Sequence, residues 1–147
     1  MDTEKIENIL NDLDEIEKYV GLVEEIVNAC YLYEQPYEQI YDENNNFIYK
    51  DLLDEKLKKE EIIKDLTEEE YDLIIKMIIR KIIHRIEAKH SAYEQAILSS
   101  SNEEYKEVYG DQTAAFNHLF EHYLAEYNYY KSMKDMYEEY VEETKTK

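Results

Sequence analysis

The sequence is poor in the residues that make tight turns and covalent cross-links. Its 147 residues include two glycines, one proline, one cysteine and no tryptophan. Sheet proteins use glycine and proline at their tight turns, so this scarcity favours long helices. The single cysteine, Cys30, excludes an internal disulfide and favours a reducing compartment. It falls on an apolar helix face, where we expect a packed and inert thiol.

Long apolar runs and the common catalytic motifs are also absent. No stretch reaches the ~20 apolar residues of a membrane span, and residues 1–10 lack the basic start and apolar run of a secretory signal. We therefore predict a cytoplasmic protein without membrane contact. The sequence contains neither a glycine-rich phosphate loop nor a G-x-S-x-G elbow, and we predict no enzymatic activity and no cofactor.

Positive charge is scarce as well. The 17 Lys and Arg residues face 36 Asp and Glu residues, which gives a net charge of −19. Such a surface is repelled by anionic membranes and by nucleic acid phosphates, so direct binding to either is not expected. With 44% hydrophobic residues, the chain is long enough for one core, and we predict a single helical domain over residues 1–147.

A helix over residues 67–98 has the strongest sequence signal. Thr67 and Glu70 have the spacing of a capping box, and three glutamates in the first turn oppose the positive end of the helix dipole. Apolar side chains cover about half of the helix circumference, which predicts an inner helix with several neighbours. The same arrangement places Lys76, Arg80 and His84 on the opposite side, where we expect solvent.

Two other long segments show heptad-like spacing of apolar residues. The first runs from residue 2 or 3 to about residue 33, and the last runs from about residue 112 to 143. Their seams consist of Ile6, Ile9, Leu13, Ile16, Val20, Val23, Val27 and Cys30, and of Phe116, Phe120, Tyr123, Tyr127, Tyr130, Tyr137 and Val141. The seams pack either within the chain or against a second copy. Packing within the chain is favoured because the other amphipathic segments also need partners.

Three smaller elements complete the predicted fold. They are a helix over about residues 51–65, a helix of one or two turns between Ser101 and Gly110, and a small β-hairpin near residues 37–49 around an Asn-rich turn. The predicted fold class is therefore all-α: a bundle of about four main helices, two of them long with heptad-like seams, plus the hairpin.

Two histidine patterns are candidates for metal chemistry. The motif H-x-x-E-H occurs at His118, Glu121 and His122, where two histidines one turn apart can share a zinc ion and the glutamate can act as base. However, the apolar seam of the last helix turns both histidines outward, and a catalytic zinc needs a third ligand and a shaped cavity. Glu87 and His90 form one copy of a unit that di-iron bundles need twice. We predict no metal site, and a metal-dependent enzyme is the third hypothesis for function.

Tyrosine and carboxylate content indicate a protein-binding surface. The 16 tyrosines, against three phenylalanines, supply rigid contact area with a polar tip, as in many interfaces. Carboxylates at i and i+4 stand roughly 5–6 Å apart on a helix, and rows of them can imitate nucleic acid phosphates in a basic groove. The candidate partner-binding residues are Glu24, Glu25, Glu138, Glu139, Glu142, Glu143, Tyr129 and Tyr140.

In its acidic, helical and tyrosine-rich style, the whole chain resembles the inhibitors that phages and mobile elements use against host nucleases, the anti-restriction and anti-CRISPR proteins. The resemblance includes no family motif. It implies a bacterial host cytoplasm and a basic nucleic-acid-binding partner, such as a defence nuclease, which is inhibited by nucleic-acid mimicry or by other contacts. The alternative hypothesis is a helical dimerisation or assembly module, such as a homodimer, in which the charge only provides solubility.

Overall fold

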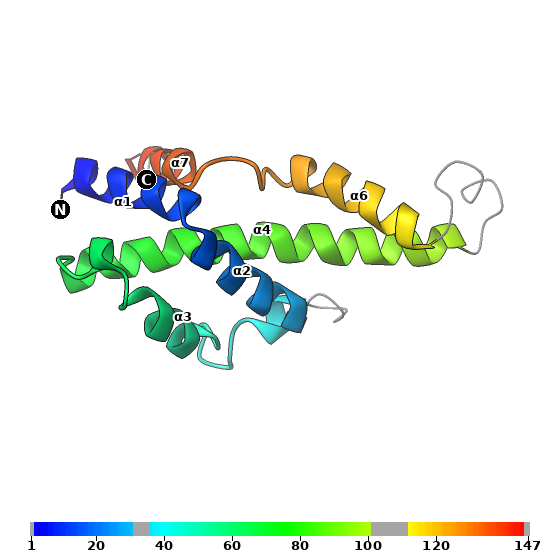
Figure 1. The fold of residues 1–147 in the computed structure, drawn as a ribbon, viewed down its shortest axis with the longest axis horizontal. Helices are drawn as coiled ribbons and strands as arrows, with labels where there is room; N and C mark the ends of the chain where they lie inside the picture. Colours follow the sequence, from blue (N-terminus) through cyan, green and yellow to red (C-terminus); the bar gives the residue numbers. More distant parts are fainter. Residues whose placement is uncertain (1, 31–35, 101–111, 146–147) are drawn as a thin grey trace.

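A computed structural model describes residues 2–30, 36–100 and 112–145 of the protein (Figure 1). Within these ranges the protein is mostly helical and has no β-strand, so the all-α prediction is confirmed. Every helix in the same ranges is too short or too polar to span a bilayer. The α-helices are α1 (Thr3–Glu15), α2 (Glu17–Cys30), α3 (Lys50–Leu57), α4 (Glu68–Ser100), α6 (Gln112–Glu126) and α7 (Met133–Lys145), and the short 3-10 helices are η1 (Pro36–Gln39) and η2 (Glu61–Ile63).

The long helix α4 is the element on which the others pack (Figure 1). It begins at the predicted capping box: the Glu70 backbone N–H donates to Thr67 Oγ1 at 3.1 Å, and the Thr67 N–H donates to Glu70 Oε1 at 3.0 Å. Helices α1 and α7 lie side by side along its first half, and α6 packs on its second half. Helix α2 crosses it, and α3 lies on the side away from α7 (Figure 1).

The N-terminal segment was predicted to be one continuous helix, but it forms two helices, α1 and α2. Ile16 has extended backbone angles (φ −80°, ψ 113°) and separates α1 from α2. The buried face of α2 therefore differs in part from the predicted seam: Tyr19 is buried, whereas the predicted seam residue Val20 is 45% exposed. Val23, Val27 and Cys30 are buried as predicted. The break allows α1 to pack beside α7 while α2 crosses α4. Gly21, five positions further on, lies inside α2.

The predicted C-terminal helix is also interrupted. Helix α6 ends at Glu126, and Asn128 adopts a left-handed conformation (φ 62°) that asparagine tolerates better than most residues. A new helix, α7, begins after Ser132. Ser132 is its N-cap, because its Oγ accepts a hydrogen bond from the Asp135 N–H at 3.1 Å. Tyr130 lies in the interruption and is 59% exposed, so its predicted place in the seam is wrong.

The predicted hairpin near residues 37–49 is not confirmed. A single antiparallel bridge joins Tyr41 and Phe47. Between them the Asp42 carboxylate accepts hydrogen bonds from the backbone N–H groups of Asn44 and Asn46 at 2.8 and 2.9 Å, which closes a compact turn instead of extending two strands. The predicted helix over residues 51–65 ends early as α3 and is followed by η2. The short helix predicted between residues 101 and 110 lies outside the described residues.

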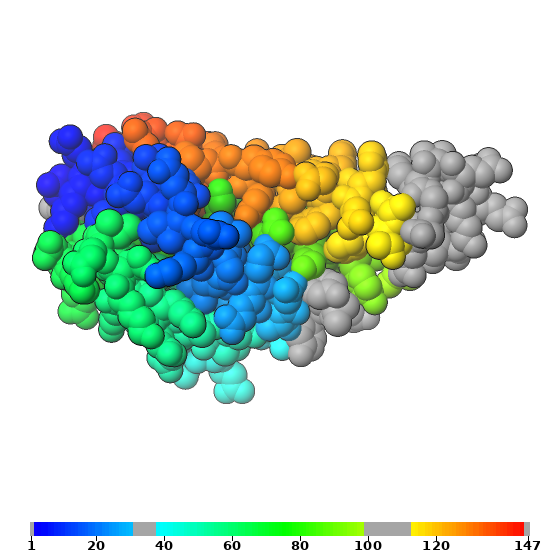
Figure 2. Space-filling model, viewed as in Figure 1, coloured from blue at the N-terminus to red at the C-terminus, as the bar shows by residue number. Residues whose placement is uncertain are grey.

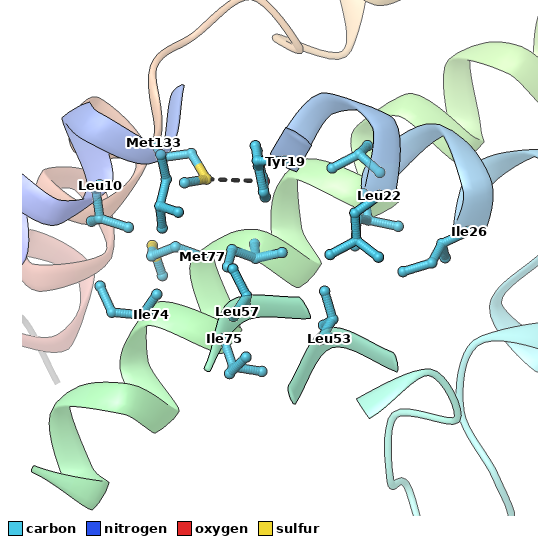
Figure 3. Close-up of a cluster of buried hydrophobic side chains, with 14 of the residues drawn as sticks. Leu10, Tyr19, Leu22, Ile26, Leu53, Leu57, Ile74, Ile75, Met77 and Met133 are labelled. Carbon is cyan, nitrogen blue, oxygen red and sulfur yellow. Dashed lines mark hydrogen bonds between the residues drawn. The ribbon is translucent and has the colours of Figure 1, made fainter. Parts of the chain in front are cut away.

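The hydrophobic core surrounds α4 between Leu73 and Ile86 and unites α1, α2, α3 and α7 (Figure 3). Tyr19 sits within it, and its hydroxyl donates to the Met133 sulfur at 3.2 Å. Most apolar residues of the predicted N-terminal seam are buried inside this core, which favours packing within the chain. Beyond the core, the buried positions of α4 are small, and α6 packs there; these positions are Ala88, Ala92 and Ala96.

Candidate interaction surface

Three cations spaced four residues apart on α4, Lys81, Arg85 and Lys89, form a row that we call the cation ladder. Its first member, Lys81, lies 3.9 Å from Asp14 of α1, and its ammonium lies 4.9 Å from the Tyr129 ring centroid. Lys81 Nζ also donates to the Lys131 carbonyl oxygen at 2.7 Å. Burial raises the pKa of Asp14 and lowers the pKa of Lys81, because the loss of water disfavours both charges despite their attraction.

Arg85 is the middle member of the cation ladder. Its guanidinium forms an ion pair with Glu24 of α2. The guanidinium carbon lies 4.8 Å from the Phe120 ring centroid and 5.0 Å from that of Tyr129. The planar cation therefore lies against two aromatic rings, an arrangement that favours arginine over lysine.

Lys89 ends the ladder. Its ammonium hydrogen-bonds to the Asn28 side-chain oxygen and lies 5.9 Å from the Phe120 ring centroid. Burial lowers the pKa of Lys89, and the Glu24 carboxylate partly opposes this effect. Each cation thus joins a group on α1 or α2 to an aromatic ring on α6 or in the segment after it. The cation ladder therefore links the N-terminal helices to the C-terminal part of the chain.

The cation ladder changes the interpretation of two predicted partner-binding residues. Glu24 is engaged within the chain by Arg85. Tyr129, which was expected to be exposed, is half-buried beneath Lys81 and Arg85, and burial raises the pKa of its hydroxyl. The expected exposure of Tyr140 is wrong in the same way, because it is partly buried against the core. Glu25 remains exposed on α2.

The remaining candidates gather at one end of the molecule, where α1, α7 and the first turns of α4 meet (Figure 1). We call this region the acidic end. Helix α1 carries five acidic residues and one lysine, and α7 carries five acidic residues and two lysines. The acidic residues of these segments are Glu4, Glu7, Asp12, Asp14 and Glu15 on α1, Glu68, Glu69, Glu70 and Asp72 on α4, and Asp135, Glu138, Glu139, Glu142 and Glu143 on α7.

The four predicted glutamates of α7 differ in their neighbours. All four are exposed. Glu139 forms an ion pair with Lys131, and Glu143 lies 3.6 Å from the Arg80 guanidinium. Glu142 has a more distant partner, Lys145, at 3.9 Å. The α7 group and the pair Glu24 and Glu25 lie on different helices, which diverge (Figure 1), so the predicted residues do not form one patch.

Within the acidic end, Lys5 links α1 to the start of α4. Its ammonium lies 3.3 Å from Glu70 Oε1 and donates to the Asp65 carbonyl oxygen at 2.9 Å. The Thr67 backbone hydrogen bond lowers the pKa of Glu70 most, and Lys5 lowers it further against the opposing effect of desolvation. Glu70 is therefore held as a carboxylate inside the junction and is only 4% exposed.

The histidine patterns occupy different positions. His118 and His122 both face outward, as predicted. His122 lies 3.3 Å from Glu126, and the Glu121 carboxylate accepts a hydrogen bond from the Tyr130 hydroxyl. His90 lies 3.3 Å from Glu94 and is mostly buried. Among the residues that the structure describes, no three His, Cys, Asp or Glu side chains come together as a metal site.

Cys30 and His84 are both removed from solvent, at least in part. Cys30 is buried, as expected of a packed thiol, and burial raises its pKa. His84 was expected on a solvated face, but it is half-buried, and desolvation lowers its pKa. The cation ladder itself was missed. The sequence feature that could have indicated it is the four-residue spacing of Lys81, Arg85 and Lys89 beside the apolar face of the helix. The aromatic residues of the last predicted helix are the groups that could cover these cations.

No protein-family model, no curated protein and no solved structure matches this chain. The functional proposal therefore depends on the charge and geometry of the surface.

Proposed function

We propose that the protein binds a basic nucleic-acid-binding protein through its acidic end and blocks access of nucleic acid to it. The observation that supports this proposal is the convergence of α1, α7 and the first turns of α4, which brings carboxylates from three distant parts of the chain to one end. A concentrated negative surface attracts a positive groove over long range and raises the rate of association. A nuclease is the partner class implied by the acidic inhibitors that the chain resembles.

The internal pairing of some acids identifies those that are available to a partner. Glu138 and Glu142 are both exposed, and the ion pair of Glu142 with Lys145 is long, at 3.9 Å, so both can meet a cation at little cost. Glu24 would first have to leave Arg85, which would expose the cation ladder. We therefore assign docking to α7 with the neighbouring face of α1, and not to Glu24 and Glu25.

The structure offers less support for the two other hypotheses. The apolar residues of the N-terminal seam are largely buried in the core of the same chain, so a dimerisation module would need another surface. The side chains of the H-x-x-E-H motif point outward, and Glu121 and His122 contact Tyr130 and Glu126. Neither arrangement provides a specific observation in favour of assembly or of metal-dependent catalysis.

The proposal is tested by competition. A partner is first captured from a host lysate at low salt, purified, and loaded with fluorescently labelled DNA or RNA. Titration of this protein should release the nucleic acid, and the effect should weaken steeply between low and high salt, because the attraction is screened over ~10 Å at 0.1 M salt. A stable ternary complex with unchanged partner activity would overturn the proposal.

Charge reversal locates the surface. The double variant Glu138→Lys/Glu142→Lys should weaken displacement at least tenfold. A matched control with the same charge change, Glu43→Lys/Glu55→Lys, alters exposed acids of the Asn-rich turn and of α3 and should leave displacement nearly unchanged. Polyglutamate provides a second control, since equal displacement by this polymer would indicate a general polyanion effect.

A further inference from the structure

A small cavity lies where the break at Ile16 faces the end of α3. Its volume is about 230 Å³. The floor is apolar and belongs to the core, because Leu13, Leu22 and Leu57 are all nearly fully buried. Tyr19 and Leu22 approach Leu57 in this region of the core (Figure 3), and the atoms of α2 lie against those of α3 on the face shown in Figure 2. Ile16, where the chain leaves the helix before α2 begins, is one of the residues that line the cavity.

Three lysines surround this cavity. They are Lys18 of α2, Lys56 of α3 and Lys59, and one acid, Glu60, shares the rim. All three lysines are exposed, and within the described part of the chain none forms an ion pair with a carboxylate. Lys50, Lys76 and Lys134 also form no ion pair within the described ranges, but they do not line this cavity. The rim is thus a positive site on a negative protein.

We propose that this cavity binds a small organic anion that has a short apolar body, with an acyl carboxylate as the chemical type. An apolar floor accepts the body, and the exposed lysines of the lining supply the positive charge that attracts the head group. The volume is below the ~300–1,000 Å³ of sites for drug-sized ligands, which selects a compact ligand. The site takes a ligand of the opposite charge to the partner of the acidic end, so it is independent of the proposed function.

The competing explanation is that the lysines only cover apolar surface. Lysine stems often lie along apolar side chains while their ammonium groups reach water. The two explanations differ in one respect. A covering role gives no preference for the charge of a ligand, whereas the proposed site requires a negative head group.

The probes are octanoate and octylammonium, which share the apolar tail and differ in the sign of the head group. The intact protein is labelled with ¹³C at its methyl groups and titrated with each probe. Octanoate should shift the methyl signals of Leu13, Leu22 and Leu57 saturably, with a dissociation constant of about 1 mM, as expected for a ligand of this size. Octylammonium should bind these residues at least tenfold more weakly, although the net charge of −19 attracts it to the protein as a whole.

Lysine variants test the rim. The triple variant Lys18→Gln/Lys56→Gln/Lys59→Gln should weaken octanoate binding at least tenfold. The matched control is Lys50→Gln/Lys76→Gln/Lys134→Gln, which removes the same charge at three exposed positions away from the cavity lining. It should bind octanoate nearly as well as the unaltered protein does. Methyl spectra of the unliganded variants confirm that the fold is retained.

Three outcomes would overturn the proposal. They are the absence of saturable methyl shifts with octanoate, equal binding of octylammonium at the same methyl groups, and unchanged octanoate affinity in the rim triple variant. Binding of the basic partner should be retained in that variant, so failure of this site and failure of the acidic end can be told apart.

Discussion

The carboxylate of Asp14 caps a helix that begins 119 residues later: its Oδ2 accepts a hydrogen bond from the Met133 backbone N–H at 2.8 Å. Met133 is the first residue of α7, where the N–H groups have no partner within the helix. The negative charge of Asp14 also lies at the positive end of the α7 dipole. One side chain of α1 thus fixes the start of α7, and Lys81 of the cation ladder lies 3.9 Å from the same residue.

Replacement of Asp14 tests this cap. Asp14→Ala leaves the Met133 N–H without its acceptor and Lys81 without its nearest carboxylate, so we expect a loss of about 1–2 kcal/mol in the free energy of unfolding. Asp14→Asn keeps an acceptor and should lose less. The measurement is urea unfolding, and Asp12→Ala, at an exposed position of α1, is the control. Equal losses at positions 12 and 14 would refute the capping role.

The aromatic enclosure of Arg85 gives a second prediction. Arg85→Lys keeps the charge but removes the planar group that lies against Phe120 and Tyr129, and it should cost about 1–2 kcal/mol of stability. Arg80→Lys is the control, because Arg80 is more exposed and its partner Glu143 lies 3.6 Å away at the surface. That change should stay within about 0.5 kcal/mol. If both substitutions have the same small effect, Arg85 contributes only its charge.

A third prediction concerns pH. The folded-state pKa of Glu70 is lowered, first by the Thr67 backbone hydrogen bond and then by Lys5. Glu70 therefore contributes stability that is present above its unfolded pKa, and this contribution is lost as the pH falls through the lower folded pKa. Glu70→Gln retains the capping geometry without the charge. The stability difference between the two proteins should be constant near neutrality and shrink as the pH falls below about 4. A difference independent of pH would contradict the assignment.

A fourth prediction uses two isoleucines of opposite burial. Ile78 is fully buried on α4, and Ile48 is 50% exposed next to the Asn-rich turn. Ile78→Asp would bury an unpaired charge and should cost more than about 4 kcal/mol, which is enough to unfold many domains. Ile48→Asp should cost about 0.5 kcal/mol or less. Circular dichroism and thermal unfolding of both variants give the comparison, and a stable Ile78→Asp protein would show that this side of α4 is not core.

The parts of the fold that could be predicted from the sequence are those governed by local interactions. Thr67 and Glu70 form the predicted capping box because both partners lie within one helical turn. The helix breaks depend on distant contacts. The residues on both sides of Ile16 are helical, so the local sequence does not indicate a break there. The extended backbone of Ile16 allows α1 to reach α7 while α2 crosses α4. Asparagine at position 128 is compatible with a turn. The predicted seam, however, continued across it from Tyr127 to Tyr130, so the sequence did not indicate a break there.

The same limit applied to the candidate surface. Sequence periodicity placed Glu24 away from the apolar seam, but it could not reveal that Arg85 of another helix would take that carboxylate as its partner. Tyr129 was expected at the surface because it fell outside the seam, and the interruption after α6 instead turned it toward Lys81 and Arg85. The glutamates of α7 were predicted to be exposed, and they are, because α7 retains one regular amphipathic register from Met133 onward.

The pairing of α1 with α7 has a consequence for the order of folding. Helices α4 and α6 are close in sequence, whereas the contacts from Tyr19 and Asp14 to Met133 close loops of 114 and 119 residues. Closing a long loop costs more chain entropy than closing a short one, so we expect the α4–α6 hairpin to form early and the chain ends to meet late. That late step brings two acidic helices together against their mutual repulsion. Added salt should therefore accelerate refolding in stopped-flow experiments, although the same salt weakens binding of a basic partner.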